Sequence, residues 1–357
     1  HLCHRSLLRV QVLDRRGICI INSQSESHTI PALRAGVLSP WVAFTANEGA
    51  PAEALLERAG IHPELLQQPA AVVPFKRALC WVELAGKSLG TAQLGVQVGA
   101  ATPIESLGAY GRILASALTL HQYVEQGISL YRTLVRGQTI WLSAHGNRVR
   151  VNLGAAWKPS PGDRQARMNF LAVSIANIRR FAGPRWSPTE ISVGFKPREP
   201  IPLDVFGDAP VVDRPGQTYF AFPRPLLGLR LCSDDQRLAA PPTAPLEVLP
   251  SDLAGLVELQ IASLLSGRVP PVDLVAETLG TSRRSLQRGL AEQGVNYTDL
   301  LTKVRLRRAA EWLERSDKPV VEIAFELGYA DASNFTRAFR QLTGVTPSAF
   351  RQSAGLG

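Results

Sequence analysis

The chain has 357 residues, of which 45% are hydrophobic, 39 are Lys or Arg and 30 are Asp or Glu. This length allows two domains with a core each, and no stretch approaches the roughly 18 uncharged apolar residues of a membrane-spanning helix, which argues against an integral membrane protein. The formal charge of +9 favours a polyanionic partner, but residues 250–357 carry 13 Lys and Arg against 12 Asp and Glu, so the excess lies mostly upstream.

Residues 1–36 mix charged with apolar side chains and lack the n-region, h-region and cleavage site of a secretory signal. We expect them to form a poorly structured N-terminal extension. The four cysteines, Cys3, Cys19, Cys80 and Cys232, are far apart and form no C-x-x-C pair. Such cysteines do not suit framework disulfides, so a reducing cytoplasm is the expected compartment.

An α+β domain is predicted for residues 37–236. Apolar residues at helical spacing occur in Pro51–Gly60, Phe75–Leu84, Leu107–Arg136 and Asp163–Ala182. Alternating apolar and polar residues about Gly146 and Asn147 predict a β-hairpin. Further strands are predicted in the segments "EISVGFK", "PLDVF" and "LGLRLC".

Aromatic residues of this domain are candidates for lining an effector pocket: Trp81, Tyr110, Tyr131, Trp141 and Trp157. The alternative for each is ordinary core packing, which is the commoner role of an isolated Trp or Tyr. The histidines show no metal-ligand spacing, so neither a metal site nor a cofactor is predicted.

A semi-rigid linker is predicted at residues 237–251, because "RLAAPPTAPLEVLPS" is rich in proline and alanine. Residues 252–357 then form a second predicted domain, which is all-α. An internal repeat organises it: Val272, Val275, Ala276, Leu279 and Gly280 recur 48 residues later as Val320, Ile323, Ala324, Leu327 and Gly328. After the glycine the offset becomes 49, so that Leu286, Arg288 and Leu290 correspond to Phe335, Arg337 and Phe339.

Each copy of the repeat predicts a helix-turn-helix. In the second copy, a stripe that includes Ile323 and Leu327 faces inward, Gly328 ends the first helix and Asp331 caps the next one. The second helix then buries Phe335 and Phe339.

The outward faces of the two second helices carry residues that can donate to phosphates and base edges. In the second copy these are Ser333, Thr336, Arg337 and Arg340, and in the first they are Arg284, Gln287 and Arg288. The alternative is an ordinary solvated helix face, which the repetition of arginine at matching positions makes less attractive. Arg283 is a further candidate for contacting DNA.

A long helix is predicted between the two copies, in "YTDLLTKVRLRRAAEWLER", with Leu300, Leu301, Val304 and Trp312 on its apolar side. A helix of about 18 residues is about 27 Å long, which would set the two recognition helices about one DNA turn apart. Arg305, Arg307 and Arg308 of this helix would then contact phosphates or form an exposed basic face.

The segment Ile323–Arg351 resembles the signature of the AraC/XylS family of bacterial transcription regulators, and "LGTSRRSLQRGLAEQG" resembles that family's first helix-turn-helix. The resemblance implies sequence-specific binding to double-stranded promoter DNA and RNA polymerase as a partner. By position it implies base contacts from these residues: Arg284, Gln287, Arg288, Ser333, Asn334 and Arg337.

The upstream domain more loosely resembles the arabinose-binding-type effector and dimerisation domain of one branch of this family, through residues 94–134 and the hairpin that follows. The resemblance implies a small-molecule effector and a homodimer. The leading interpretation is an effector-controlled transcription activator and not an enzyme. The alternatives are an enzyme or DNA-repair protein with a DNA-targeting tail, and a DNA-binding protein without a ligand.

Overall fold

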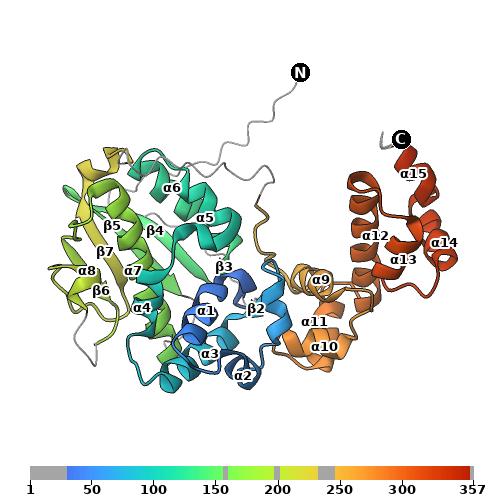
Figure 1. Cartoon of the computed structure of the whole chain (residues 1–357), viewed down its shortest axis with the longest axis horizontal. Coiled ribbons are helices and arrows are strands. Elements are labelled where there is room, and N and C mark those ends of the chain that lie inside the picture. Colours follow the sequence, from blue (N-terminus) through green and yellow to red (C-terminus); the bar gives the residue numbers. More distant parts are fainter. Residues whose placement is uncertain (1–29, 156–159, 197–201, 232–245, 354–357) are drawn as a thin grey trace. The chain divides into compact units, whose positions relative to one another are not determined.

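The computed structural model describes residues 30–155, 160–196, 202–231 and 246–353 (Figure 1). Two compact units make up the chain. Unit 1 contains Ala85–Val248, and unit 2 combines His28–Leu84 with Leu249–Gly357. This division differs from the predicted boundaries at residues 36, 236 and 251, because residues 37–84 group with the C-terminal helices and not with the rest of the α+β part.

Unit 1 is built on a four-stranded antiparallel sheet. Its strands are β4 (Gln138–His145), β5 (Arg148–Ala155), β6 (Glu190–Val193) and β7 (Thr218–Pro223), in the order β4-β5-β7-β6. Val149, Val151 and Leu153 of β5 are buried and alternate with polar residues, so that one face of the sheet is apolar. The long helix α7 (Pro161–Ala182) contacts β6 and β7.

Helix α4 (Leu94–Ala101) crosses α7 at close range because glycines line the crossing. A Cβ on Gly95 would lie 2.0 Å from the carbonyl oxygen of Gln165, and one on Gly99 would lie 2.8 Å from the Cβ of Ala172. The backbone N–H of Gly95 donates to Gln165 Oε1 at 2.8 Å. The absence of side chains at these two positions therefore allows the helices to meet.

The remaining elements of unit 1 are short. The α-helices are α5 (Gly108–Ala115), α6 (Leu120–Leu130) and α8 (Leu203–Phe206). The 3-10 helices are η3 (Ile104–Leu107), η4 (Tyr131–Thr133) and η5 (Arg224–Gly228), and β3 is Val135–Arg136. Thr119 caps α6 by accepting a hydrogen bond from the Gln122 N–H at 3.1 Å.

Unit 2 begins with an antiparallel pair of strands, β1 (Ala32–Arg34) and β2 (Val72–Pro74). The helices that accompany them are η1 (Ala35–Val37), α1 (Ser39–Asn47), α2 (Ala52–Arg58), η2 (Pro63–Gln67) and α3 (Phe75–Ser88), the last of which crosses into unit 1 at Ala85. Seven further helices follow Leu249: α9 (Leu253–Leu264), α10 (Val272–Thr278), α11 (Arg283–Glu292), α12 (Tyr297–Arg315), α13 (Val320–Glu326), α14 (Ala332–Thr343) and α15 (Pro347–Ser353).

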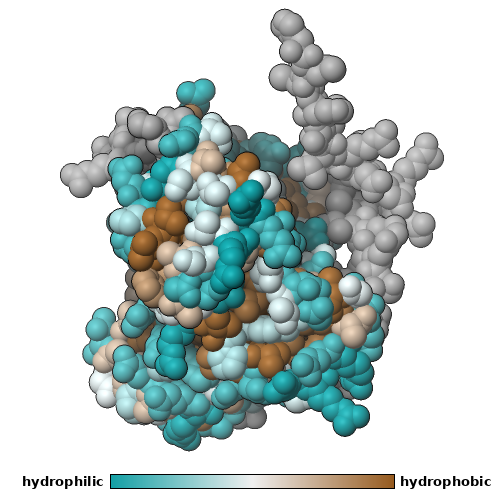
Figure 2. All heavy atoms as spheres, turned by 90° about the vertical axis from the view of Figure 1, so that its right-hand side faces the viewer, coloured by the Kyte–Doolittle hydropathy of each residue, from teal (hydrophilic) through white to brown (hydrophobic). Residues whose placement is uncertain are grey.

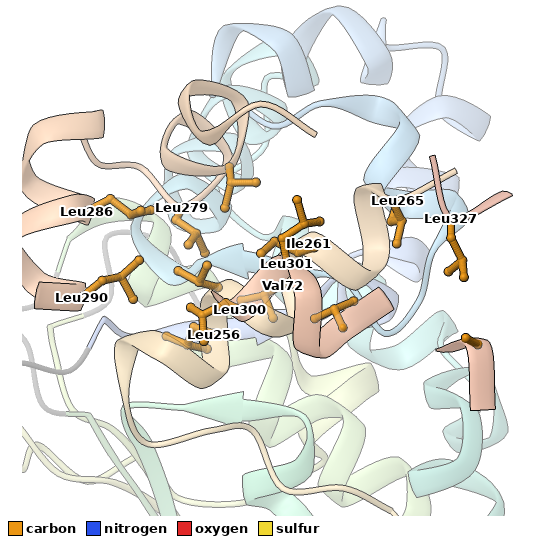
Figure 3. Packing of buried hydrophobic residues seen from close by; sticks show 14 of the residues in the cluster. Val72, Leu256, Ile261, Leu265, Leu279, Leu286, Leu290, Leu300, Leu301 and Leu327 are labelled. Atoms are coloured by element: carbon orange, nitrogen blue, oxygen red, sulfur yellow. The ribbon is translucent and has the colours of Figure 1, made fainter. Parts of the chain in front are cut away.

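One hydrophobic core joins the two parts of unit 2 (Figure 3). Ala32 of β1 and Val72 of β2 belong to the same buried cluster as Leu256 and Ile261 of α9. The backbone N–H of Val72 donates to Gln260 Oε1 at 3.3 Å, in a fully buried position. Residues nearly 190 positions apart in sequence therefore share one core.

Several predicted elements are confirmed. The helices at Pro51–Gly60, Phe75–Leu84 and Asp163–Ala182 correspond to α2, α3 and α7. The hairpin is formed by β4 and β5, with Gly146 in the turn at φ +61°, and "EISVGFK" contains β6. Both helix-turn-helix units and the long helix between them, α12, are present, so the predicted fold class is confirmed.

Other predictions are wrong. The segment Leu107–Arg136, in which helical spacing was noted, contains two helices, α5 and α6, because Thr119 caps a new helix in an extended backbone conformation. The segment "PLDVF" forms the helix α8 instead of a strand, and the described part of "LGLRLC" follows η5 with only an isolated bridge at Arg230. Strand β7 was not predicted, because its residues Tyr219–Phe222 are all buried and do not alternate.

The N-terminal extension and the linker are described only in part. Residues 1–29 and most of the linker lie outside the described residues. Residues 32–37, which were expected to be poorly structured, form β1 and η1, and Ala32, Leu33 and Ala35 are buried. They are anchored because β1 pairs with β2 over its whole length.

Candidate DNA-binding site

Helix α11 presents the first candidate recognition face. Ser282 caps it by accepting a hydrogen bond from the Ser285 N–H at 3.2 Å, and Leu286 and Leu290 anchor its inner side in the core (Figure 3). The predicted contact residues all lie on its exposed side: Arg283, Arg284, Gln287 and Arg288.

Helix α14 presents the second face in the same way. Asp331 caps it through the Asn334 N–H at 2.7 Å, and Gly344 ends it in the left-handed conformation at φ +81°. Phe335 and Phe339 are buried and pack against one another in a tilted arrangement, with ring centroids 5.7 Å apart. Ser333, Asn334, Arg337 and Arg340 are exposed.

Some of these exposed groups are held by neighbours on their own surface. Arg337 Nη2 donates to Asn334 Oδ1 at 2.5 Å, while Asn334 Nδ2 donates to Asp331 Oδ2 at 2.6 Å. This chain of bonds orients the Asn334 amide beside the Arg337 guanidinium, so two of the residues predicted to contact bases lie next to each other.

The first face is held more loosely. Arg283 Nη1 pairs with Asp273 Oδ2 at 3.2 Å, and Arg288 Nε lies 3.9 Å from Glu292 Oε1. Exposed ion pairs of this kind contribute little to stability and leave the arginines available. Arg284 and Gln287 make no hydrogen bond or ion pair with the described part of the chain.

The arginines of α12 do not form the phosphate-contacting row that the sequence suggested. Arg305 donates from Nε to the carbonyl of Leu327 at 2.8 Å and from Nη2 to that of Gly328 at 2.9 Å. Arg308 Nη1 donates to the carbonyl of Leu265 at 3.0 Å. Burial lowers the pKa of both guanidinium groups. Each arginine satisfies the carbonyl groups at a helix end, which is a structural role.

Trp312 packs against the core, as predicted, and Arg307 is exposed, which is one of the two expectations for it. Arg307 Nη1 lies 3.6 Å from Glu258 Oε2. Trp312 is half-buried, with Lys318 Nζ 5.0 Å from its ring centroid, whereas Leu313 is fully buried on the inner side of α12. The sequence pattern identified the large aromatic residue and missed the smaller leucine beside it.

The effector candidates are separated in the structure. Trp81 is fully buried, and its Nε1 donates to the carbonyl of Ala52 at 3.3 Å, which is a core position in unit 2. Trp141 packs against the backbone of Gly154. Trp157 lies outside the described residues. Among the candidates that the structure describes, Tyr110 and Tyr131 come close together in unit 1, where burial and, to a smaller extent, Tyr123 and Tyr131 raise the pKa of Tyr110.

Three further residues that lie near Tyr110 and Tyr131 were not singled out by the sequence analysis. Tyr123 and Gln126 of α6 are one helical turn apart, and Gln138 accepts a hydrogen bond from the Tyr131 hydroxyl at 2.8 Å. The spacing of Tyr123, Gln126 and Gly127 at i, i+3 and i+4 was the available signal for a shared helix face.

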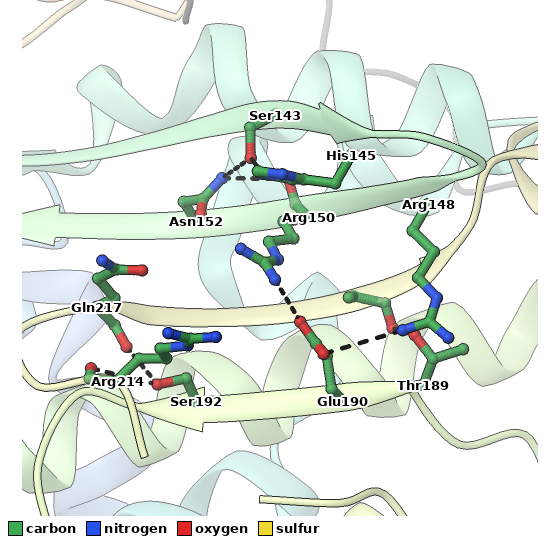
Figure 4. Close-up of polar contacts among 11 residues, drawn as sticks. Ser143, His145, Arg148, Arg150, Asn152, Thr189, Glu190, Ser192, Arg214 and Gln217 are labelled. Carbon is green, nitrogen blue, oxygen red and sulfur yellow. Dashed lines mark hydrogen bonds and ion pairs between the residues drawn. The ribbon is translucent and has the colours of Figure 1, made fainter. Parts of the chain in front are cut away.

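A second polar cluster covers the outer face of the sheet (Figure 4). Arg150 Nη2 pairs with Glu190 Oε1 at 2.7 Å, and its guanidinium carbon lies 4.3 Å from the ring centroid of Tyr219. Asn152 Nδ2 donates to Ser143 Oγ at 3.0 Å. Because these groups largely satisfy one another, the cluster is a cross-strand network that joins all four strands.

The described residues contain no group of three or more His, Cys, Asp or Glu side chains placed to hold a metal ion. Within the same part of the chain, none of the helices combines the length and the apolar character needed to cross a membrane.

Two family models match this chain, one in its N-terminal part and one in its C-terminal part. Residues 275–353 match the model of a helix-turn-helix domain, and residues 49–231 match the model described as the arabinose-binding domain of AraC transcription regulator, N-terminal. The chain is 27% identical over 320 residues to the ornithine utilization regulator of Pseudomonas aeruginosa, which covers 87% of this chain and 93% of that protein.

Two further relatives match over most of their length. An uncharacterized HTH-type transcriptional regulator of Mycobacterium tuberculosis is 26% identical over 318 residues, covering 85% of this chain and 92% of that protein. The crystal structure of the transcriptional regulator CdpR from Pseudomonas aeruginosa aligns with 22% identity and a TM-score of 0.32, covering 73% of this chain and 87% of that one.

Proposed function

The chain belongs to the AraC family of transcription regulators, and from that premise we propose that it activates transcription at promoters it recognises with α11 and α14, under the control of a small molecule bound by unit 1. It is an HTH-type transcription regulator with an N-terminal ligand-binding domain and not an enzyme. The observation that carries the proposal is the pair of duplicated helices whose inner sides are buried and whose outer sides expose arginine and amide groups.

Base readout is assigned to the two exposed faces. Arg284, Gln287 and Arg288 on α11 would read one major-groove segment, because Arg and Gln side chains pair with purine edges in two-point contacts. On α14, the Asn334 and Arg337 side chains lie hydrogen-bonded to each other, which fixes their separation before DNA arrives.

The remaining candidates complete the two faces. Ser333 and Arg340 flank the Asn334–Arg337 pair on α14, and Arg283 starts α11. These side chains are suited to positioning the helices on the phosphate backbone. The spacer α12 has 19 residues, about 28 Å in length, which supports contact with two successive grooves on one face of the duplex.

A protein partner for the second helix-turn-helix, with RNA polymerase as the proposed partner, is supported by its surface. Val321 and Phe325 of α13 are 53% and 52% exposed, and Figure 2 shows hydrophobic patches on the side of the molecule that it presents. At the corresponding positions the first unit carries the acids Asp273 and Glu277. Exposed large apolar side chains in only one of two copies favour a protein contact there.

The effector and the dimer are proposed from the relatives of this chain. A relative that spans almost the same length is named for ornithine utilization, which favours a small metabolite as the effector of this chain too. Homodimerisation is proposed from the family resemblance. A cytoplasmic location is proposed because the promoter DNA that the protein would bind is in the bacterial cytoplasm. Light scattering of the purified chain tests the dimer directly.

Arginine substitutions on the two faces test the DNA-binding proposal. Arg288→Ala and Arg337→Ala should each weaken binding to a promoter fragment by about 1–3 kcal/mol and relax sequence preference at one segment of the site. Arg315→Ala, an exposed arginine at the end of α12, is the matched control and should leave the footprint unchanged. Unaltered footprints for both face variants would contradict the assignment of α11 and α14.

A further inference from the structure

Three tyrosines of unit 1 come together in its interior, from α5, α6 and η4. Tyr110 and Tyr123 are buried, and the Tyr110 hydroxyl donates to the carbonyl of Gly127 at 3.3 Å. Tyr131 donates to Gln138 Oε1 at 2.8 Å. Burial raises the pKa of all three phenols, and the nearness of Tyr123 and Tyr131 raises that of Tyr110 further. We call Tyr110, Tyr123 and Tyr131 the tyrosine cluster.

One polar group beside the cluster lacks a partner within the described part of the chain. Gln126 Oε1 is buried and accepts no hydrogen bond. It lies one helical turn after Tyr123, on the same face of α6. Buried acceptors without a donor are rare in proteins and costly to maintain, so each such group calls for an explanation. A ligand that brings hydrogen-bond donors would supply the missing partner.

A carboxylate and a guanidinium stand near the same hydroxyl. Arg180 Nη1 lies 3.7 Å from Glu105 Oε1, and their side chains are 19% and 44% exposed. Both act on Tyr123: Arg180 lowers its pKa and Glu105 raises it, against the larger upward effect of burial. The ring of Phe181, the residue after Arg180, lies 5.7 Å from the ring of Tyr123. Opposite charges therefore flank the outer side of the tyrosine cluster.

We propose that the tyrosine cluster, with Gln126, Glu105 and Arg180, binds a small amino acid. Its ammonium group would donate to Gln126 Oε1 and lie against the tyrosine rings, near Glu105, while Arg180 would pair with its carboxylate. A protonated amine fits because it has three donors and no acceptor, and because aromatic rings attract cations. A guanidinium matches a carboxylate in a two-point contact. The inference rests on the proposed function, since it names the chemical class of the effector.

Thermal unfolding and titration calorimetry of the full chain test this assignment. The probes are the standard L-amino acids and L-ornithine at millimolar concentration, each tested singly. For the amino acid with the largest effect, its decarboxylated amine and its deaminated acid are then compared. We expect the amino acid to raise the midpoint temperature by several degrees at saturation, the amine to bind more weakly, and the acid to have no effect.

Two conservative variants locate the site. Tyr123→Phe and Gln126→Leu should each weaken binding of that amino acid by about tenfold, as expected for one lost hydrogen bond to a charged group. The matched control is Tyr219→Phe. Tyr219 is likewise buried, but it lies on the sheet beside Arg150 and Glu190. Its replacement should leave the affinity unchanged. Circular dichroism and thermal unfolding without ligand confirm that each variant is folded.

The outcomes separate this inference from the proposed function. No midpoint shift with any amino acid or amine, in a chain that binds promoter DNA specifically, would overturn the amino acid assignment and leave DNA regulation standing. Stabilisation by the deaminated acid alone, or an equal loss in the Tyr219→Phe control, would also overturn it. A chain that binds the amino acid but no DNA would keep the ligand site and refute the regulator.

Discussion

Tyr297 closes the start of the spacer helix α12. Its hydroxyl donates to the carbonyl of Pro270 at 2.5 Å, and burial raises its pKa to about 12, against a smaller lowering by Arg305. The neutral phenol is therefore the form that the folded protein stabilises. This one bond ties the first residue of α12 to the segment that precedes α10.

The stability of unit 2 should consequently fall in alkaline solution. Below about pH 10 the phenol is protonated in both states, whereas between about pH 10 and about pH 12 the unfolded chain releases a proton that the folded chain retains. Stability from Tyr297 is thus fully present below about pH 10 and is lost as the pH rises through 12.

Tyr297→Phe checks this reasoning. The variant should be less stable than the original chain by about 0.5–1.5 kcal/mol at neutral pH, because the bond to Pro270 is lost. Urea unfolding at about pH 9 and about pH 11 should show this difference shrinking at the higher pH. A constant difference would mean that the hydroxyl titrates equally in both states.

At the scale of elements, the crossing of α4 and α7 depends most strongly on the missing side chain of Gly95. Gly95→Ala would place a Cβ 2.0 Å from the backbone carbonyl of Gln165, which no rotamer change can relieve. We expect a loss of about 3 kcal/mol or more in the free energy of unfolding of unit 1. Gly228→Ala is the control, since its Cβ would meet no atom within 4 Å. A small effect of Gly95→Ala in calorimetry would show that the helices slide apart without cost.

The helices of the duplicated helix-turn-helix could be predicted from local sequence, whereas the roles of two arginines between them could not. Apolar spacing, a turn glycine and a capping residue determined α10, α11, α13 and α14, because each is a local property of fewer than about twenty residues. The roles of Arg305 and Arg308 were not accessible in this way. Their acceptors, the carbonyls of Leu327, Gly328 and Leu265, are brought near only by the packing of α12 against other helices.

At the scale of the whole molecule, the N-terminal segment contributes to the core beneath the first helix-turn-helix. Val72 is fully buried in the cluster that holds Leu256, Ile261 and Leu286, and its N–H meets Gln260. The DNA-binding helices therefore share their core with residues 28–84, although most of unit 1 lies between these two segments in the sequence. This continuity supplies a physical link along which a change in residues 28–84 would reach α9 and α10.

Val72→Ala tests that link. The substitution should lower the free energy of unfolding of unit 2 by about 2 kcal/mol by opening a cavity in the shared core. Fluorescence of Trp312, isolated by replacing the other tryptophans with Phe, should report a lower unfolding midpoint. Val211→Ala, at an exposed site in unit 1, is the control. A Trp312 midpoint that does not move would show that residues 28–84 and the DNA-binding helices unfold independently.

Local sequence determined the two helix-turn-helix units, the spacer helix, the β4–β5 hairpin and the exposed sides of α11 and α14, because a helix or hairpin with one apolar side reveals its period and its caps within a short window. Tertiary structure alone decided that β7 is a buried strand, that residues 28–84 join the core of the DNA-binding helices, that Arg305 and Arg308 of α12 bind carbonyl groups, and that Tyr110, Tyr123 and Tyr131 meet. Each of these features depends on contacts between segments that are far apart in the sequence. Such contacts stabilise the fold without producing a periodic pattern of residues.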